Sequence, residues 1–306
     1  MKVAVIGAGA MGGSLAGHAA RAGHDVVAID VSPAFIDQVS AHGLRVDTPE
    51  GPFTADVTAT SDASAAGPCE LVVIFVKAQH TEAAGKSLQH VTGPGTAVLT
   101  LQNGWGNADR IAPYVAPEQL VVGVTYNSCT TSGPGQVIHS GRGLTIVGPY
   151  RGDDTGPARL AAALLTESGW QAEVSDSVRT EIWKKLVLNA ATLPTAALSR
   201  LTAGALGQPG ELLDLVDALA AETVAVAVAQ GLDVDLGERL TAIHRTLERA
   251  GAGRPSMLQD VLADRKTEVE TVNGAVAAAA AEHGVAVPLN TAMNALIHGL
   301  ERSYLP

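Results

Sequence analysis

Short apolar runs recur over the first 175 residues, and helical or glycine-containing segments separate them. These runs cover residues 2–6, 25–30, 71–78, 97–101, 120–129, 135–141 and 144–148. Continuous apolar runs of this length are typical of parallel strands that are buried on both faces. The pattern predicts an α/β domain over residues 1–175, and it places a last helix and a short strand just before the end of that domain.

From about Asp176 the strand pattern stops and a helical period replaces it. The predicted helices cover residues 178–191, 211–230, 236–250, 265–283 and 291–304. Gly231, Gly251 and Gly284 follow three of them, in the position where glycine ends helices. We expect an all-helical second domain over residues 176–306, a hinge near 173–177, and a substrate cleft between the two domains.

The turn after the first apolar run has the sequence GAGAMG. It comprises Gly7, Ala8, Gly9, Ala10, Met11 and Gly12. A strand, this turn, a helix and a second strand within about 30 residues form the context of the dinucleotide-binding Rossmann fingerprint. Gly7 would allow the tight turn, Gly9 the close approach of a pyrophosphate, and Gly12 the packing of helix on strand. The helix N-terminus would bind the phosphates.

Asp30 ends the second apolar run, about 20 residues after the fingerprint, where an acidic residue binds the ribose 2′-hydroxyl. A carboxylate there repels a 2′-phosphate, so Asp30 favours NADH over NADPH. An alternative is that Asp30 only caps the helix that follows, because DVSP also resembles a turn into a helix.

Two polar residues follow later apolar runs. Lys77 lies at the end of the run 71–78, and Asn103 lies in the loop after the run 97–101. Ligands of open α/β sheets bind at the carboxyl ends of the strands. Asn103 is therefore a candidate for binding the nicotinamide ribose or a substrate oxygen, although an Asn before Gly is also a common turn residue.

The apolar stretch WKKLVLNAATLP carries a second polar group. Lys185 and Asn189 are four residues apart, so they share one face of a helix and can point into one cleft. Lys184 lies about 100° further round the helix and is expected to face solvent.

A third polar group lies in PSMLQDVLADRKTEVETVNG. Ser256 resembles a loop or N-cap residue, and Arg265 and Glu268 would share a face of the helix 265–283. A solvated ion pair of Arg265 with Glu268 is the alternative to a functional role.

Composition limits the possible partners. The chain has 306 residues, 46% of them hydrophobic, and a net charge of −11. This charge disfavours nucleic acids and anionic membranes, and the alanine-rich run 215–230 is interrupted by acidic residues, so no membrane span is expected. Cys69 and Cys129 show no metal-binding or disulfide spacing, which fits the reducing cytoplasm.

Taken together, GAGAMG, VKAQHT, LQNG, WKKLVLN and PSMLQDVLADRKTEVETVNG resemble the ketopantoate reductase (2-dehydropantoate 2-reductase) family nearly end to end. The resemblance implies a Rossmann domain followed by a helical domain. It also implies reduction of a small 2-oxo acid to an (R)-2-hydroxy acid with NAD(P)H, without a metal.

The resemblance further implies roles for the polar residues. Lys185 would polarise and protonate the carbonyl oxygen, and Glu268 would position Lys185 or the cofactor ribose. Asn189 and Ser256 would bind substrate, and Lys77 and Asn103 would line the cofactor edge. An ammonium group beside the oxygen stabilises the negative charge that hydride addition creates.

The sequence departs from the family pattern at three positions. Leu193 and Ala203 stand where substrate-binding asparagines are usual, and Asp30 stands in a family that usually uses NADPH. These departures leave open an NAD-dependent D-2-hydroxyacid dehydrogenase of the same family that acts on a more apolar 2-oxo acid. A third alternative is a non-catalytic dinucleotide-binding regulator, against which the retained polar residues argue. The apolar helices would permit a homodimer.

Overall fold

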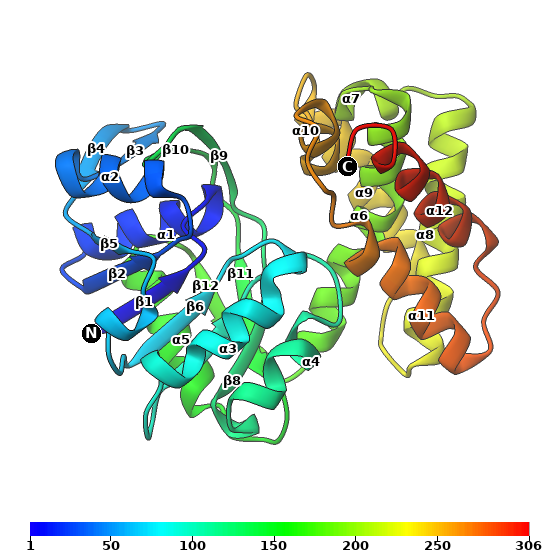
Figure 1. The fold of residues 1–306 in the computed structure, drawn as a ribbon. Helices are drawn as coiled ribbons and strands as arrows, with labels where there is room; N and C mark the ends of the chain where they lie inside the picture. Colours follow the sequence, from blue (N-terminus) through cyan, green and yellow to red (C-terminus); the bar gives the residue numbers. More distant parts are fainter. Residues whose placement is uncertain (306) are drawn as a thin grey trace. The chain divides into compact units, whose positions relative to one another are not determined.

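The computed structural model describes residues 1–305 and divides into two compact units. The first unit contains Met1–Gln102 and Asn107–Val178, and the second contains Asn103–Gly106 and the chain from Arg179 onward (Figure 1). The four residues 103–106 therefore leave the first unit, pack with the helical unit, and return. This excursion matters because it carries Asn103.

An eight-stranded sheet forms the centre of the first unit. Its order is β12-β11-β8-β7-β6-β1-β2-β5. The strands are β1 (Lys2–Ile6), β2 (Asp25–Ile29), β5 (Thr58–Thr60), β6 (Leu71–Ile74), β7 (Ala97–Thr100), β8 (Leu120–Thr125), β11 (Thr145–Pro149) and β12 (Ala172–Val174). All neighbours are parallel except β8 and β11. The predicted Rossmann-type α/β fold is confirmed.

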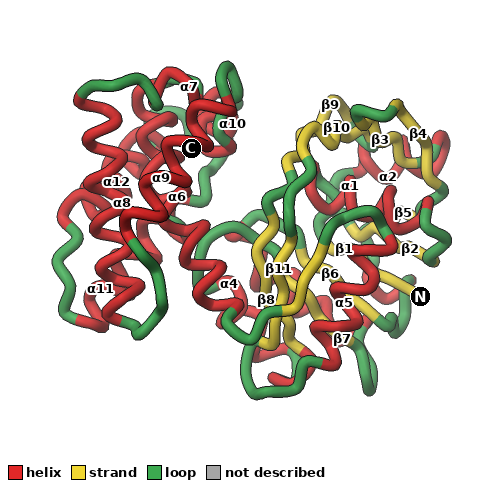
Figure 2. The backbone as a smooth tube through the Cα atoms, turned by 180° about the vertical axis from the view of Figure 1, so that it is seen from behind, coloured by secondary structure: helices red, strands yellow, loops and turns green. Residues whose placement is uncertain are grey.

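Helices cover both faces of this sheet (Figures 1 and 2). They are α1 (Ala10–Arg21), α2 (Pro33–His42), α3 (Thr81–Val91), α4 (Asn107–Ile111) and α5 (Gly156–Glu167), with the 3-10 helices η1 (Ala63–Ala65), η2 (Ala78–His80), η3 (Ala112–Tyr114) and η4 (Pro117–Gln119). Strand β1 shows why the central strands are apolar throughout. Its Val3 and Val5 lie in one core cluster with Leu15 of α1, whereas Ala4 and Ile6 lie in a second cluster on the other face.

A second, four-stranded sheet of order β4-β3-β10-β9 lies against α1. Its strands are β3 (Leu44–Thr48), β4 (Gly51–Ala55), β9 (Ser128–Gly133) and β10 (Gln136–Gly141). The apolar pattern predicted β10. It did not predict the β3–β4 hairpin, because only alternate residues of β3 are apolar. The single apolar run predicted over 120–129 is divided between β8 in the large sheet and the start of β9 in the small one.

The second unit is helical, as predicted. It contains α6 (Val178–Ser199), α7 (Ala203–Leu206), α8 (Glu211–Ala229), α9 (Leu236–Ala250), α10 (Ser256–Leu262), η5 (Val269–Thr271), α11 (Asn273–His283) and α12 (Pro288–Glu301). Its core forms around α6, whose Trp183, Val187 and Ala190 are fully buried. Helix α6 continues past the predicted end at 191 and through Pro194, since packing on both sides outweighs the lost backbone N–H.

The predicted helix 265–283 is wrong in its first part. Residues 265–268 form an irregular segment, η5 follows at Val269–Thr271, and the α-helix begins only at Asn273. Asp264 has a φ angle of +51, and this backbone conformation changes the direction of the chain between α10 and this segment. The positive φ, rare for a residue with a side chain, is the local reason that no helix continues there.

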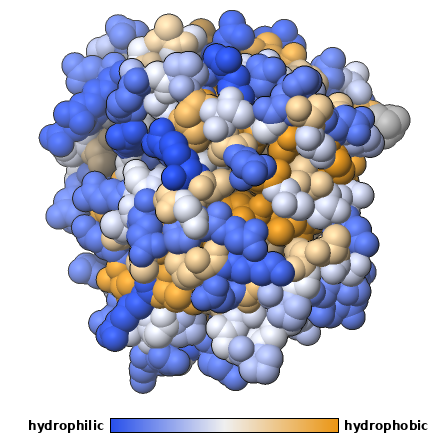
Figure 3. All heavy atoms as spheres, turned by 90° about the vertical axis from the view of Figure 1, so that its left-hand side faces the viewer, coloured by the Kyte–Doolittle hydropathy of each residue, from blue (hydrophilic) through white to orange (hydrophobic). Residues whose placement is uncertain are grey.

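Hydrophilic side chains predominate on the face drawn in Figure 3, with apolar patches between them. Within residues 1–305, no helix has both the length and the apolar character needed to cross a membrane.

Candidate functional site

The glycine turn after β1 is built so that side chains are excluded at two of its positions. Gly7 has φ +90, and a Cβ atom there would lie 2.6 Å from the backbone nitrogen of Val76. A Cβ atom at Gly12 would collide with the carbonyl oxygen of Gly7. At Gly9, by contrast, a Cβ atom would meet no heavy atom within 4 Å. The backbone at Gly9 therefore faces open space, as the approach of a pyrophosphate requires.

Helix α1 begins directly after this turn. Gly9 is its N-cap residue, and no side chain among the described residues caps it. The first N–H groups of α1 and the positive end of its dipole remain available for a phosphate. Ala8, Ala10 and Met11 complete the turn without adding charge, so the whole predicted loop fits a dinucleotide.

Asp30 follows β2 and is tied to the glycine turn. One oxygen of its carboxylate accepts a hydrogen bond from the backbone N–H of Ala8 (2.9 Å), and the other accepts one from Ser32 (2.9 Å). The cap of α2 is Ser32, whose hydroxyl accepts from the N–H of Phe35. The N-cap residue of the helix is therefore Ser32 and not Asp30, although Asp30 binds the turn that leads into the helix. The next side chain, Val31, is 89% exposed and uncharged.

Lys77 lies three residues beyond the end of β6 and is the N-cap residue of η2. Nearby, the side-chain amide of Gln102 donates to the carbonyl of Val76 and to the hydroxyl of Thr81, both at 2.8 Å. These bonds join the carboxyl ends of β6 and β7. Lys77 therefore lies at the carboxyl-terminal edge of the sheet, as the sequence predicted, next to strand ends that these hydrogen bonds hold together.

Lys185 of α6 is the central polar group of the helical unit. Its ammonium group donates a hydrogen bond to the side-chain oxygen of Asn103 (2.9 Å). Burial lowers the pKa of Lys185 to about 8, and the negative charge of Glu268 acts in the opposite direction. Lys184 lies on another face, where it pairs with Glu181 (2.8 Å). The two adjacent lysines therefore lie on different faces, as the helical spacing predicted, but Lys184 does not fully face solvent, because only 24% of its side chain is exposed.

Gly104 and Trp105, the two residues after Asn103, both contact the helical unit. Gly104 has φ +88, and a side chain there would collide with the carbonyl oxygen of Thr271. The same carbonyl accepts a hydrogen bond from the N–H of Trp105 (2.8 Å), and the rings of Trp105 and Trp183 lie 5.8 Å apart. Trp105 and Thr271 were not predicted as part of the site. The one feature of the sequence that could have indicated Trp105 is the run of Gly, Trp and Gly directly after Asn103.

Asn189 lies one helical turn beyond Lys185 and is 7% exposed. One turn further, Leu193 is partly buried and packs into an apolar cluster with Met257 and Val269. Ser256 is the first residue of α10, next to Met257. The structure thus brings Leu193 into an apolar cluster that includes Met257 and Val269, the sequence neighbours of Ser256 and Glu268.

One interpretation of the sequence needs correction. Arg265 and Glu268 do not share a helix face, because Glu268 is the N-cap residue of η5 and Arg265 pairs with Asp260 (3.2 Å). Ala203 is 6% exposed and packs in the core of the helical unit. The inference from Ala203 to a more apolar substrate stays a prediction.

Residues 3–152 match the family described as ketopantoate reductase PanE/ApbA, and residues 177–301 match the C-terminal domain of that family. A 2-dehydropantoate 2-reductase from Halobacterium salinarum is 32% identical over 307 residues, which cover 99% of each chain. One from Pyrococcus abyssi is 30% identical over 300 residues, which cover 98% of this chain and 96% of the relative.

Two solved structures share the fold along the whole chain. A ketopantoate reductase from Ralstonia eutropha has a TM-score of 0.91 at 32% identity and covers 100% of both chains. A D-mandelate dehydrogenase, solved with NADH and anilino(oxo)acetate, has a TM-score of 0.94 at 28% identity and covers 99% of both chains. With both halves of the sequence matched, the chain belongs to the ketopantoate reductase family of NAD(P)H-dependent oxidoreductases.

Proposed function

We propose that this protein reduces the ketone of a 2-oxo acid to an (R)-2-hydroxy acid, with Lys185 as the proton donor. One observation carries the proposal: the ammonium group of Lys185 is partly buried, held by Asn103, and has a pKa of about 8. An ordinary lysine titrates near 10.5 and is a weak acid at neutral pH. A buried amine close to neutrality is suited to general acid catalysis.

The proton transfer follows from the charges. When bound, the reduced nicotinamide supplies a hydride to the ketone carbon. Negative charge then develops on the ketone oxygen, where the Lys185 ammonium stabilises it and gives up a proton. Glu268 raises the pKa of Lys185 against the effect of burial, so the lysine is protonated at pH 7. Asn103 orients the ammonium through its side-chain oxygen.

Asn189 and Ser256 are proposed as substrate ligands. Asn189 lies on the Lys185 face of α6, and its amide can both donate and accept hydrogen bonds. The Ser256 hydroxyl has the same capacity. Two such groups suit the carboxylate and ketone oxygens of a 2-oxo acid.

We assign the cofactor to the glycine turn, Asp30 and Lys77, and we propose NADH as the preferred form. Asp30 ends β2 beside the turn, and its carboxylate would accept from a ribose 2′-hydroxyl while repelling a 2′-phosphate. Val31, the next residue, offers no positive charge to a phosphate. A lysine near the cofactor, Lys77, would act at the other end of the dinucleotide.

Ketopantoate is the first candidate substrate. The relatives from Halobacterium salinarum and Pyrococcus abyssi are both named 2-dehydropantoate 2-reductase, and they align over nearly the full chain. Lys185, Asn189 and Glu268, to which the resemblance assigns roles in the reaction, are present here.

A second candidate is a more apolar 2-oxo acid, and Leu193 favours it. Leu193 packs with Met257 and Val269, so an apolar wall lies one turn beyond Asn189. A hydroxylated substrate that loses a polar partner in such surroundings binds more weakly by about 1–3 kcal/mol. The similar D-mandelate dehydrogenase, whose structure contains NADH, supports this candidate.

The test follows absorbance at 340 nm while the protein oxidises NADH or NADPH. Ketopantoate and a panel of branched and aromatic 2-oxo acids serve as substrates, and chiral chromatography identifies the product. Turnover with any of them to an (R)-2-hydroxy acid supports the proposal. Dinucleotide binding without turnover of any 2-oxo acid would contradict it and favour the regulator. Leu193→Asn should shift kcat/KM toward ketopantoate if the apolar candidate is correct.

A cytoplasmic location and a homodimer complete the proposal. The two cysteines, Cys69 and Cys129, are not disulfide-bonded, which suits a reducing compartment. Light scattering at several protein concentrations would test the dimer.

A further inference from the structure

A buried carboxylate lies behind the segment that carries Glu268. Glu301 is the last residue of α12, and only 5% of it is exposed. A carboxylate out of water is costly unless hydrogen bonds satisfy it. One oxygen of Glu301 accepts from both the N–H and the hydroxyl of Thr267, each at 2.7 Å. Both bonds go to the residue that precedes Glu268.

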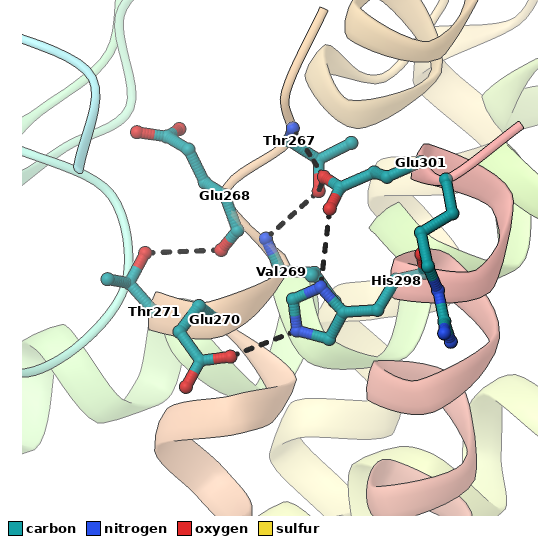
Figure 4. A network of polar contacts seen from close by, with 8 residues as sticks. Thr267, Glu268, Val269, Glu270, Thr271, His298 and Glu301 are labelled. Carbon is teal, nitrogen blue, oxygen red and sulfur yellow. Dashed lines mark hydrogen bonds and ion pairs between the residues drawn. The ribbon is translucent and has the colours of Figure 1, made fainter. Parts of the chain in front are cut away.

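Thr267, which Glu301 holds, is in turn hydrogen-bonded to the residues that follow it. Its hydroxyl also accepts from the N–H of Val269 (3.2 Å), and the hydroxyl of Thr271 donates to the carbonyl of Glu268 (3.1 Å). The backbone of Glu268 is therefore fixed on both sides. Figure 4 shows the Glu268 carboxylate, the group that would act on Lys185, pointing away from this network of hydrogen bonds.

The same segment supports the other partner of Lys185. The carbonyl of Thr271 accepts from the N–H of Trp105, two residues after Asn103. Asn103 and Glu268, which contact Lys185 by hydrogen bond and by charge, are thus both attached to residues 267–271.

His298 supports Glu301 from the other side. One ring nitrogen of His298 lies 3.2 Å from the second oxygen of Glu301, and the other lies 3.0 Å from Glu270 (Figure 4). The ring links α12 to η5 and leaves the Glu301 carboxylate few alternative orientations. This carboxylate is a rigid support and not a solvated surface charge.

We propose that Glu301 is a positioning residue that holds Glu268 in place through Thr267, and so sets the environment of Lys185. The inference rests on the proposed function of Lys185 and Glu268, but Glu301 itself contacts Thr267 and His298 and is not among the groups proposed to bind substrate or cofactor. Residue types that could replace it are limited to those that accept two hydrogen bonds at one oxygen. A glutamine meets this condition, whereas an alanine does not.

The test compares Glu301→Ala and Glu301→Gln with a matched control. Glu222 also accepts backbone hydrogen bonds from α12, at Leu289 and Asn290 (both 2.9 Å), but at the opposite end of that helix. E301A should lower kcat by about 10–100-fold, with little change in KM, because the reacting groups shift. E301Q should keep most of the wild-type kcat. E222A should lower stability and leave kcat close to that of the wild type.

A double mutant tests whether Glu301 acts through Glu268. If Glu301 acts through Glu268, E301A should change kcat by no more than about 2-fold in the E268A background. Thr267→Val, which keeps the shape and removes the hydroxyl, should reproduce part of the E301A effect and covers the case in which E301A does not fold. A full E301A effect in the E268A background, or equal losses of kcat in E301A and E222A, would overturn the proposal.

A readout without turnover separates this inference from the proposed function. Titration of the Lys185 side-chain nitrogen by NMR, assigned with Lys185→Arg, needs no substrate. In E301A the Lys185 titration should move to lower pH, because Glu268 then raises its pKa less. E222A should leave it unchanged. If no 2-oxo acid is reduced, this shift still tests the inference, and its absence contradicts it.

Discussion

The ammonium nitrogen of Lys185 lies 2.9 Å from the side-chain oxygen of Asn103, a residue 82 positions earlier in the chain. Asn103 gives the lysine a fixed acceptor that does not cancel its charge. Asn103→Ala should therefore lower kcat by about 10–100-fold, because the ammonium loses its orientation. Steady-state kinetics measures this. Asn103→Asp keeps an acceptor but adds a negative charge, so it should retain more activity and should move the loss of activity to higher pH.

The pH dependence of the reduction should report Lys185. The proposed acid must be protonated, and its pKa is lowered to about 8 by burial. The kcat/KM for reduction should therefore be constant near neutrality and fall about tenfold per pH unit above pH 8. Glu268→Gln removes the charge that raises this pKa, so its profile should fall at lower pH. A wild-type profile that is flat up to pH 10 would exclude Lys185 as the acid.

The preference between NADH and NADPH should depend on the end of β2. In the proposed cofactor site, the Asp30 carboxylate would repel a 2′-phosphate, and the exposed, uncharged Val31 would not attract it. The double variant Asp30→Ser, Val31→Arg should lower the ratio of kcat/KM with NADH to that with NADPH at least tenfold, because one repulsion is removed and one ion pair is added. Asp25→Ser, at the other end of the same strand, is the control and should not change the ratio.

Stability should fall at mildly acid pH because of a buried histidine. His18 of α1 is 3% exposed, and its ring lies 3.1 Å from His139, which in turn lies 3.1 Å from Asn127. Burial, with the nearby His139, lowers the pKa of His18 from 6.5 to about 4. The unfolded chain binds a proton there before the folded one does. Stability is thus complete above pH 6.5 and is lost as the pH falls toward 4.

Between pH 7 and pH 5 this group should remove about 2 kcal/mol from the free energy of unfolding. Urea unfolding of the wild type and of His18→Leu at both pH values measures the difference, which should shrink in the variant. His42→Leu changes an exposed histidine and should keep the wild-type dependence. An equal pH dependence in H18L would show that other groups cause it.

The sequence predicted the parts of the fold that local patterns determine. The central strands of the large sheet are apolar on both faces, and Gly7 and Gly12 meet steric demands that only glycine fulfils. The β3–β4 hairpin was missed because its residues alternate between buried and exposed, and because β3 pairs with the distant strand β10 only in the folded chain.

The candidate site was predicted residue by residue but not in its connections. Helical spacing related Lys185 to Asn189, because that relation is local. The bond from Lys185 to Asn103 and the anchor from Glu301 to Thr267 join residues 82 and 34 positions apart. No local period encodes such contacts. The helix expected over 265–283 failed for a related reason: hydrogen bonds to α12 and to the 103–106 segment stabilise an irregular conformation there.

The most direct test of the account compares two adjacent lysines. Lys185→Ala removes the proposed acid, whereas Lys184→Ala removes only an ion pair with Glu181 on another face of α6. With the best 2-oxo acid and NADH, K185A should lose about 10²–10⁴-fold in kcat while binding NADH as tightly as the wild type in a fluorescence titration. K184A should keep nearly full activity. A K185A variant that retains the wild-type kcat would contradict the central role of Lys185.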